Sequence, residues 1–98
     1  MDHLKVIELF NRIAETKSFS EAAQLLNIPR PSASRQIHEL ERRLGVNLFH
    51  RTTRVVTLTT YGETFWEKAK RIEALSDELF EPLENQDEKP SGRIRISC

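Results

Sequence analysis

The side chains best suited to specific chemistry in this sequence form a hydrogen-bonding set between residues 30 and 39. They are Arg30, Ser32, Ser34, Arg35, Gln36 and Glu39. A guanidinium such as that of Arg35 can donate two hydrogen bonds to guanine O6 and N7, and serine hydroxyls near a helix N-terminus suit phosphate groups. These residue types therefore indicate recognition of a polar, anionic ligand.

Residues that catalyse reactions or bind metals are few and scattered. The histidines His3, His38 and His50 share no helical face and no ligand spacing, and no Ser-His-acid set is evident. The single cysteine, Cys98, excludes an intrachain disulfide and a cysteine metal cluster. We therefore predict that the protein is not an enzyme and has no cofactor or metal, and we expect His38 to be a polar surface or phosphate-facing residue.

Two helical patterns, separated by a short turn, must position the residues between 30 and 39. The first begins at Ser18 and Glu21, which have the spacing of a capping box, so that the serine caps the third helical N–H and the glutamate reaches back. The second begins near Arg30, because Pro31 is tolerated in a first turn whose N–H groups have no intrahelical partner. The buried face of the pair is expected to contain Phe19, Ala22, Ala23, Leu26, Ile37, Leu40 and Leu44. This pattern is typical of a helix-turn-helix, although small residues also occur at tight crossings in other three-helix bundles.

Charge is distributed unevenly along a chain whose formal net charge is zero. Residues 1–58 contain nine Lys or Arg against six Asp or Glu, a balance of +3, and residues 59–98 contain six against nine, a balance of −3. Residues 30–54 alone contain six basic and two acidic side chains. Such clustering is typical of a phosphate-binding surface, although a solvated basic face would give the same count.

The chain length of 98 residues indicates one domain with a modest core and little room for a deep cleft. A first helix is expected from an N-cap at Asp2 through about Glu15. Its apolar positions recur every three or four residues, at Leu4, Ile7, Phe10 and Ala14. We expect this helix to be a scaffold that packs against the helix-turn-helix.

Residues 46–58 favour extended structure, because β-branched residues dominate after Gly45, which suits the end of a helix. Two short strands are expected at residues 48–50 and 55–58, joined as a hairpin wing. The tip residues expected to contact DNA are Arg51, Thr53 and Arg54. Beside the second helix, Arg54 could enter the narrow, electronegative minor groove. The alternative is that the arginines only solubilise the edge of a hairpin.

A long helix is expected over about residues 59–84, with Thr60 and Glu63 at capping-box spacing and Pro82 marking its end. A heptad-like seam runs along it through Phe65, Ala69, Ile72, Ser76, Leu79 and Leu83. A rod of about 36 Å is too long for a compact bundle to cover, so we expect the same helix of a second chain to pair with it in a homodimer. The alternative is a helix folded back on its own core.

The C-terminal residues change in composition. Residues 85–92 are polar and contain Pro and Gly, as a hinge does, and residues 93–98 alternate like the start of a strand that has no partner. The chain is therefore expected to be the front of a larger protein. With no leader sequence and no run long enough to span a bilayer, it is expected to be cytoplasmic and free of membrane contact.

Over essentially its whole length, the sequence resembles the N-terminal region of a LysR-type transcriptional regulator. The resemblance rests on SFSEAAQLLNI, on the pattern SRQI-x-x-LE-x-x-LG-x-x-LF-x-R, and on GRIRIS where the family begins its effector domain. It implies a mainly α fold. The expected parts are a winged helix-turn-helix of three helices and a small β-hairpin at 1–58, a dimerising linker helix at 59–84, a hinge at 85–92, and the start of a truncated effector domain at 93–98.

By this resemblance the protein binds double-stranded DNA. The family's recognition-helix contacts correspond to Arg30, Pro31, Ser34 and Arg35, and its minor-groove arginine corresponds to Arg54. Three departures from the family pattern are that Pro29 replaces a common serine cap, Arg30 replaces a common glutamine, and Thr60-Tyr61 replaces the more usual Glu-Ala. The family also implies a small-molecule inducer, acting only through the missing effector domain, and a higher oligomer of the full-length protein.

Residues and resemblance together predict a sequence-specific transcriptional regulator that binds an inverted-repeat operator as a dimer, with residues 30–44 in the major groove and the wing in the minor groove. The residues expected at the DNA are Ser20, Arg30, Pro31, Ser32, Ser34, Arg35, Gln36, His38, Arg51, Thr53 and Arg54. The alternative is a winged-helix module that docks a protein and never binds DNA. Binding that is insensitive to salt would favour that alternative, because phosphate contacts release counterions.

Overall fold

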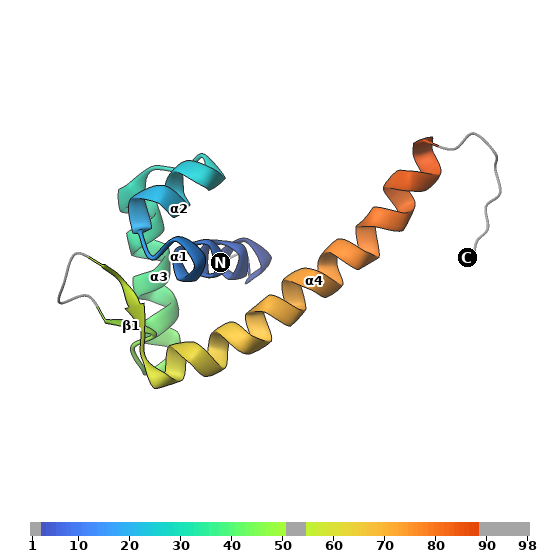
Figure 1. Ribbon diagram of the computed structural model, residues 1–98. Coiled ribbons are helices and arrows are strands. Elements are labelled where there is room, and N and C mark those ends of the chain that lie inside the picture. Colours follow the sequence, from blue (N-terminus) through green and yellow to red (C-terminus); the bar gives the residue numbers. More distant parts are fainter. Residues whose placement is uncertain (1–2, 51–54, 89–98) are drawn as a thin grey trace.

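The computed structural model describes residues 3–50 and 55–88, with side chains through residue 80. The described elements are α1 (His3–Thr16), α2 (Phe19–Leu26), α3 (Arg30–Leu44), β1 (Phe49–His50), β2 (Thr57–Leu58) and α4 (Thr60–Glu88). The first three helices and the hairpin form a cluster from which α4 extends as a long rod (Figure 1). The expected mainly α fold with a small β-hairpin is confirmed.

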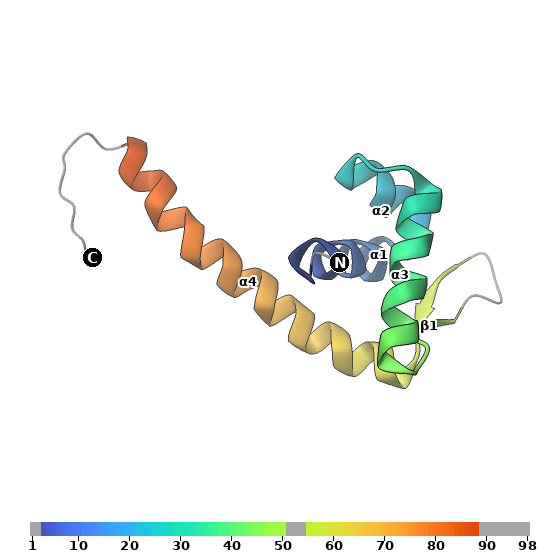
Figure 2. The ribbon, with the colours of Figure 1, turned by 180° about the vertical axis from the view of Figure 1, so that it is seen from behind.

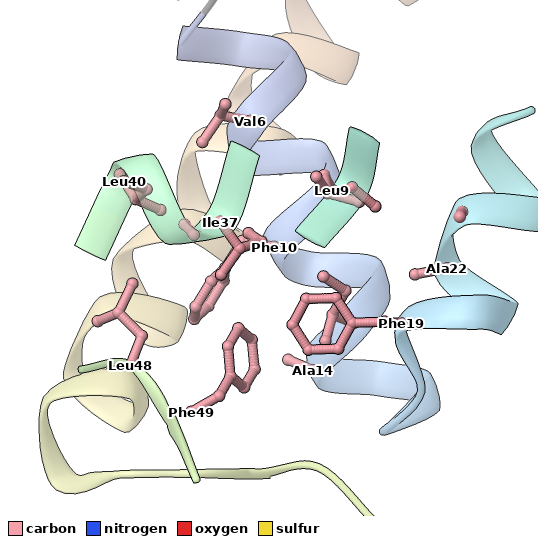
Figure 3. Packing of buried hydrophobic residues seen from close by; sticks show 14 residues of the cluster. Val6, Leu9, Phe10, Ala14, Phe19, Ala22, Ile37, Leu40, Leu48 and Phe49 are labelled. Atoms are coloured by element: carbon pink, nitrogen blue, oxygen red, sulfur yellow. The ribbon is translucent and has the colours of Figure 1, made fainter. Parts of the chain in front are cut away.

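The hydrophobic core is centred on Phe10 of α1. Its ring centroid lies 4.9 Å from that of Phe49 in β1 and 4.7 Å from that of Phe65 in α4. Phe19 of α2 meets Phe49 edge-on, with centroids 5.9 Å apart. Figure 3 shows Phe10, Phe19 and Phe49 gathered between the helices and the hairpin. Because such pairs add about 0.5–1.5 kcal/mol beyond burial, these rings hold α1, α2, the hairpin and α4 together.

The turn between α2 and α3 is tight because small residues and a left-handed cap permit it. Ala22, Ala23 and Ala33 are all buried. Asn27 has a φ of 60°, and its N–H donates to Gln24 O at 3.1 Å while Ile28 N–H donates to Ala23 O at 2.9 Å. This pair of hydrogen bonds is a Schellman motif, which ends α2 and redirects the chain into α3.

The start of α2 differs in part from the expected capping box. Ser18 Oγ accepts a hydrogen bond from Glu21 N–H at 3.1 Å, as predicted. However, Ser18 N–H donates to Thr16 Oγ1 at 3.2 Å rather than to the Glu21 side chain. Lys17, between Thr16 and Ser18, has a left-handed φ of 59°. This turn brings the Thr16 hydroxyl close to Ser18 N–H, so that Thr16 takes the place of Glu21 as the acceptor.

Two leucines that were expected in buried stripes are exposed. Leu4 is 53% exposed and Leu44 is 46% exposed. They lie in the first turn of α1 and the last turn of α3, whereas the core is centred on Phe10 and Ile37, which are fully buried. Helical spacing identified the correct face in both helices, but the terminal turns extend past the core.

The start and the end of α4 both differ from expectation. Thr59, rather than Thr60, caps the helix, because Thr59 Oγ1 accepts a hydrogen bond from Gly62 N–H at 3.0 Å. At the other end the helix continues past Pro82 to Glu88, so residues 85–88 of the expected hinge are helical. A proline removes one intrahelical hydrogen bond, and this loss does not end the helix here.

Two absences hold for the described ranges, 3–50 and 55–88. No helix there is long and apolar enough to cross a membrane. No three His, Cys, Asp or Glu side chains in these ranges are placed to share a metal ion.

Candidate nucleic-acid interface

An exposed stripe, three of whose four residues are basic or histidine, runs along the solvent-facing side of α3. Pro31, Arg35, His38 and Arg42 follow one another at intervals of four, three and four residues, and all are exposed. Arg30, the first residue of the helix, is exposed as well. Of the sequence-predicted contacts, Pro31, Arg35 and His38 lie on the stripe, and Arg30 lies beside it at the start of the helix. Arg42 was not predicted, although its spacing of four from His38 would have placed it on the same side.

The remaining predicted contacts of the two helices lie beside this stripe. Ser32, Ser34 and Gln36 are half-buried, whereas Ser20 in the first turn of α2 is exposed. Gln36 Nε2 donates to Ser32 Oγ at 3.4 Å. The glutamine and the serine therefore form one connected polar group on the flank of α3.

The N-terminus of α3 has no side-chain cap. Pro29 is the N-cap residue, and no side chain accepts a hydrogen bond there. The Pro29 carbonyl instead accepts hydrogen bonds from Ser32 N–H and Ala33 N–H, both at 3.1 Å. A helix N-terminus carries a partial positive charge, and here the cation of Arg30 adjoins it. This end of the helix therefore attracts anions.

A buried glutamate connects α3 to the wing. Glu41 is only 7% exposed, and its Oε2 atom accepts hydrogen bonds from Leu48 N–H at 2.7 Å and Phe49 N–H at 3.2 Å. Hydrogen bonds to a charged acceptor are about twice as strong as neutral ones. No role was expected for Glu41 from the sequence. The available signal was an acidic residue four positions after Ile37, on the apolar side of the helix.

The wing itself is a two-stranded antiparallel hairpin beside α3 (Figure 2). Its register pairs Phe49 with Leu58 and His50 with Thr57, so the strands are shorter than expected. Val56 N–H also donates to Lys17 O at 3.3 Å, which joins the hairpin to the loop between α1 and α2. The predicted tip contacts Arg51, Thr53 and Arg54 lie outside the described residues.

The junction between the wing and α4 is fixed by a close backbone contact. Thr59 N–H donates to Leu48 O at 3.0 Å, and the Thr59 hydroxyl donates to Asn47 O at 2.7 Å. A Cβ atom at Gly62 would overlap the same Leu48 carbonyl oxygen. Glycine is therefore required at position 62 by the close approach of α4, a role that sequence reasoning missed.

Two residues of the expected dimer seam have contacts within the chain. Ala69 is buried, and its carbonyl accepts a hydrogen bond from Asn11 Nδ2 of α1 at 3.2 Å. Phe65 packs its ring on Phe10. The first turns of α4 thus fold back on the core of the same chain, because the wing–α4 junction directs them across α1.

The exposed apolar side chains of α4 lie farther along the helix. Leu75 and Leu79 are 63% and 64% exposed, and Ile72 and Phe80 are exposed as well. Ser76, which was also expected in the seam, is half-buried. The side chain of Leu83 lies outside the described residues.

Two transcriptional regulators are similar to this chain over almost its whole length. The chain is 41% identical over 96 residues to the HTH-type transcriptional regulator YhjC of Escherichia coli (strain K12), covering 98% of this chain and 32% of YhjC. It is 44% identical over 93 residues to the HTH-type transcriptional regulator BudR of Klebsiella aerogenes, covering 95% of this chain and 65% of BudR. The chain therefore spans about a third of the length of YhjC.

A solved structure of a DNA-bound fragment is also similar to this chain. The DBD fragment of BenM, crystallised in complex with catB site 1 DNA, matches with a TM-score of 0.80 at 32% identity, covering 96% of this chain and 100% of that fragment. Residues 4–63, more than half of the chain, match the bacterial regulatory helix-turn-helix proteins of the lysR family. As its sequence resemblance predicted, the chain belongs to the lysR family of bacterial regulatory helix-turn-helix proteins.

Proposed function

We propose that this chain is the part of a transcriptional regulator that binds double-stranded DNA sequence-specifically, with α3 in the major groove. The observation that carries the proposal is the exposed stripe of α3, with Arg30 and Arg35 close to a helix N-terminus that has no side-chain cap. An α-helix fits the major groove, where a guanidinium can bind guanine with two hydrogen bonds. The similarity to the BenM DBD, which was crystallised on DNA, supports this assignment.

Base reading and phosphate binding are assigned to different residues. Arg35 lies one turn into α3 and is exposed, so it is the candidate for reading a base edge. Ser32 and Ser34, together with the helix N-terminus, suit phosphate contacts that set the register of the protein on the duplex. Ser20, exposed in the first turn of α2, suits a further phosphate.

The wing is assigned to the adjacent minor groove through Arg54. The support within the described residues is the hydrogen bonding of Glu41 to Leu48 and Phe49, which holds the base of the hairpin beside α3. A narrow minor groove has an enhanced negative potential that attracts arginine. A recognition helix and a wing held together in this way can read neighbouring grooves as one unit.

We extend the proposal to a homodimer that forms through α4. The supporting observation is the exposed apolar stripe Ile72, Leu75 and Leu79, with Phe80 beside it. Two copies of one stripe can cover each other about a twofold axis. The two α3 helices would then enter successive major grooves about 34 Å apart, which requires an inverted-repeat operator. In this arrangement residues 1–58 bind DNA and α4 links and dimerises them.

Selection of bound duplexes from a random pool by the 98-residue chain tests the proposal. An enriched inverted repeat, with affinity that falls steeply as salt is raised, is the expected result. Enrichment of isolated half-sites would support base reading and contradict the dimer. Binding that ignores both sequence and salt would contradict the whole proposal and favour a module that docks protein.

A further inference from the structure

Beyond the apolar core, α1 and α4 are joined by the side chains of Asn11, Arg12 and Glu73, which we call the α1–α4 clamp. Asn11 is completely buried, and its Nδ2 atom donates to Ala69 O at 3.2 Å and to Glu73 Oε1 at 2.8 Å. Arg12 donates from Nη1 to Glu73 Oε2 at 3.1 Å and from Nη2 to Glu73 Oε1 at 2.9 Å. Both carboxylate oxygens of Glu73 are therefore held by α1.

The clamp is stronger than an ordinary surface ion pair. Arg12 and Glu73 have side chains only 22% and 24% exposed, and their contact is a two-pronged one. Glu15 accepts two further hydrogen bonds from the same guanidinium, at 3.0 and 2.9 Å. Hydrogen bonding to Glu15, opposed by burial and reinforced by Glu73, raises the pKa of Arg12 further above its ordinary high value. The cation is therefore permanent.

The clamp lies where α4 leaves the rest of the protein. Before it, Phe65 and Ala69 pack against the core, and after it Leu75 and Leu79 are exposed. An open groove of about 120 Å³ separates the two helices here, lined by Leu4, Ile7, Glu8, Glu73, Ser76 and Asp77. Both ribbon views show the second half of α4 extending without another helix beside it (Figures 1 and 2). Glu73 therefore bonds to α1 at the point where α4 begins to leave the helical cluster.

We propose that Asn11, Arg12 and Glu73 are positioning residues that fix the angle of α4 and thereby the half-site spacing that the dimer accepts. The inference rests on the proposed DNA-binding dimer. The burial of apolar surface is not directional, whereas hydrogen bonds weaken steeply when they are bent. The clamp therefore resists rocking of α4 across α1, which the aromatic core alone would permit.

The geometry of the rod sets the size of the effect. The segment from Glu73 to Leu79, the far end of the exposed stripe, is about 9 Å long, so a tilt of about 10° at the clamp moves that end by about 1.6 Å in each protomer and by about 3 Å between the two. The same tilt displaces the two recognition helices relative to the dimer contact. Successive base pairs are about 3.4 Å apart, so the displacement corresponds to about one base pair of operator spacing.

The test measures affinity of the 98-residue chain for duplexes that carry the selected half-sites at spacings changed one base pair at a time. The wild-type chain is expected to show one sharp optimum. Glu73→Ala is expected to shift that optimum or broaden it by about one base pair, with the base preference inside each half-site unchanged. The matched control is Glu67→Ala, an exposed glutamate in the same helix, which should keep the wild-type optimum.

Each outcome decides the inference. Equal weakening at every spacing would show that the clamp only stabilises the fold, and the proposal would be overturned. A wild-type chain with no spacing optimum would contradict the proposed dimer, which separates that failure from failure of the clamp. If Glu73→Ala does not fold, the same series of spacings is measured with Glu73→Gln and Arg12→Gln, which keep most of the side-chain volume.

Discussion

The Oε2 atom of Glu41, near the end of α3, accepts a hydrogen bond of 2.7 Å from the backbone N–H of Leu48, just before β1. The same oxygen accepts a second hydrogen bond from Phe49 N–H at 3.2 Å. A single carboxylate on the helix that we propose reads DNA thus also fixes the base of the wing. The two proposed reading elements are held together by charge-assisted hydrogen bonds as well as by core packing.

Replacing Glu41 with alanine should lower the free energy of unfolding by about 1–3 kcal/mol, because it leaves buried N–H groups at Leu48 and Phe49 without their acceptor. Urea unfolding followed by circular dichroism measures the change. Glu39→Ala is the matched control, since Glu39 is exposed on the same helix, and its effect should stay within about 0.5 kcal/mol. Equal effects of the two substitutions would contradict the anchoring role.

Gly62→Ala should destabilise the protein by about 1–3 kcal/mol, although alanine is the better helix former. The new methyl group would overlap the carbonyl oxygen of Leu48, and backbone atoms there cannot move aside like the end of a flexible side chain. Thermal unfolding compared with the exposed control Glu67→Ala checks this expectation. A stabilised Gly62→Ala variant would show that α4 does not approach Leu48 so closely.

Phe10→Ala should cost about 3–5 kcal/mol of stability, because it removes the ring shared by Phe49 and Phe65 and leaves a cavity. Leu4→Ala, which changes an exposed residue of the same helix, should cost less than about 1 kcal/mol. Chemical unfolding of both variants measures the difference. Comparable losses would mean that the apolar stripe of α1 is buried along its whole length.

Arg35→Ala should weaken binding to the selected operator by about 1–3 kcal/mol and relax preference at one base position. Arg35→Lys keeps the charge but loses the planar fork, so it should retain binding to unrelated duplexes while losing that preference. Titrations of both variants against the operator and a scrambled duplex separate these effects. Equal weakening of binding to both duplexes would show that Arg35 contacts a phosphate and does not read a base. Arg71→Ala in α4, an exposed arginine, is the control.

Leu75→Glu should convert the proposed dimer to monomers, because it places a charge in the exposed apolar stripe of α4. Ala74→Glu introduces the same charge one residue earlier, about 100° around the helix axis from Leu75 and off the apolar stripe, and should leave the dimer intact. Sedimentation equilibrium of both variants gives the mass. If the two substitutions act alike, the stripe is not the dimer contact.

Local sequence signals predicted much of the fold correctly. Ser18 caps α2, Gly45 ends α3 in a left-handed conformation, and the aromatic and aliphatic spacing of α1 identifies its buried face. The predicted cap of α4 was wrong because a contact with a distant segment decided it. Thr59, which caps α4, also donates a hydrogen bond to Asn47 O. Pro82 likewise predicted a helix end that the chain passes through.

The sequence by itself determined the helix-turn-helix, the wing, the long fourth helix, and the polar set on α3, because these depend on side-chain periodicity and caps within a few residues. Only the tertiary structure decided how the elements are joined. Glu41 bonding to Leu48, Gly62 lying against the same residue, and Glu73 held by Asn11 and Arg12 are contacts between distant segments. A local pattern can place Glu41 on the apolar side of its helix, but it does not identify the partner, because only the surrounding fold brings the N–H groups of Leu48 and Phe49 to that side chain.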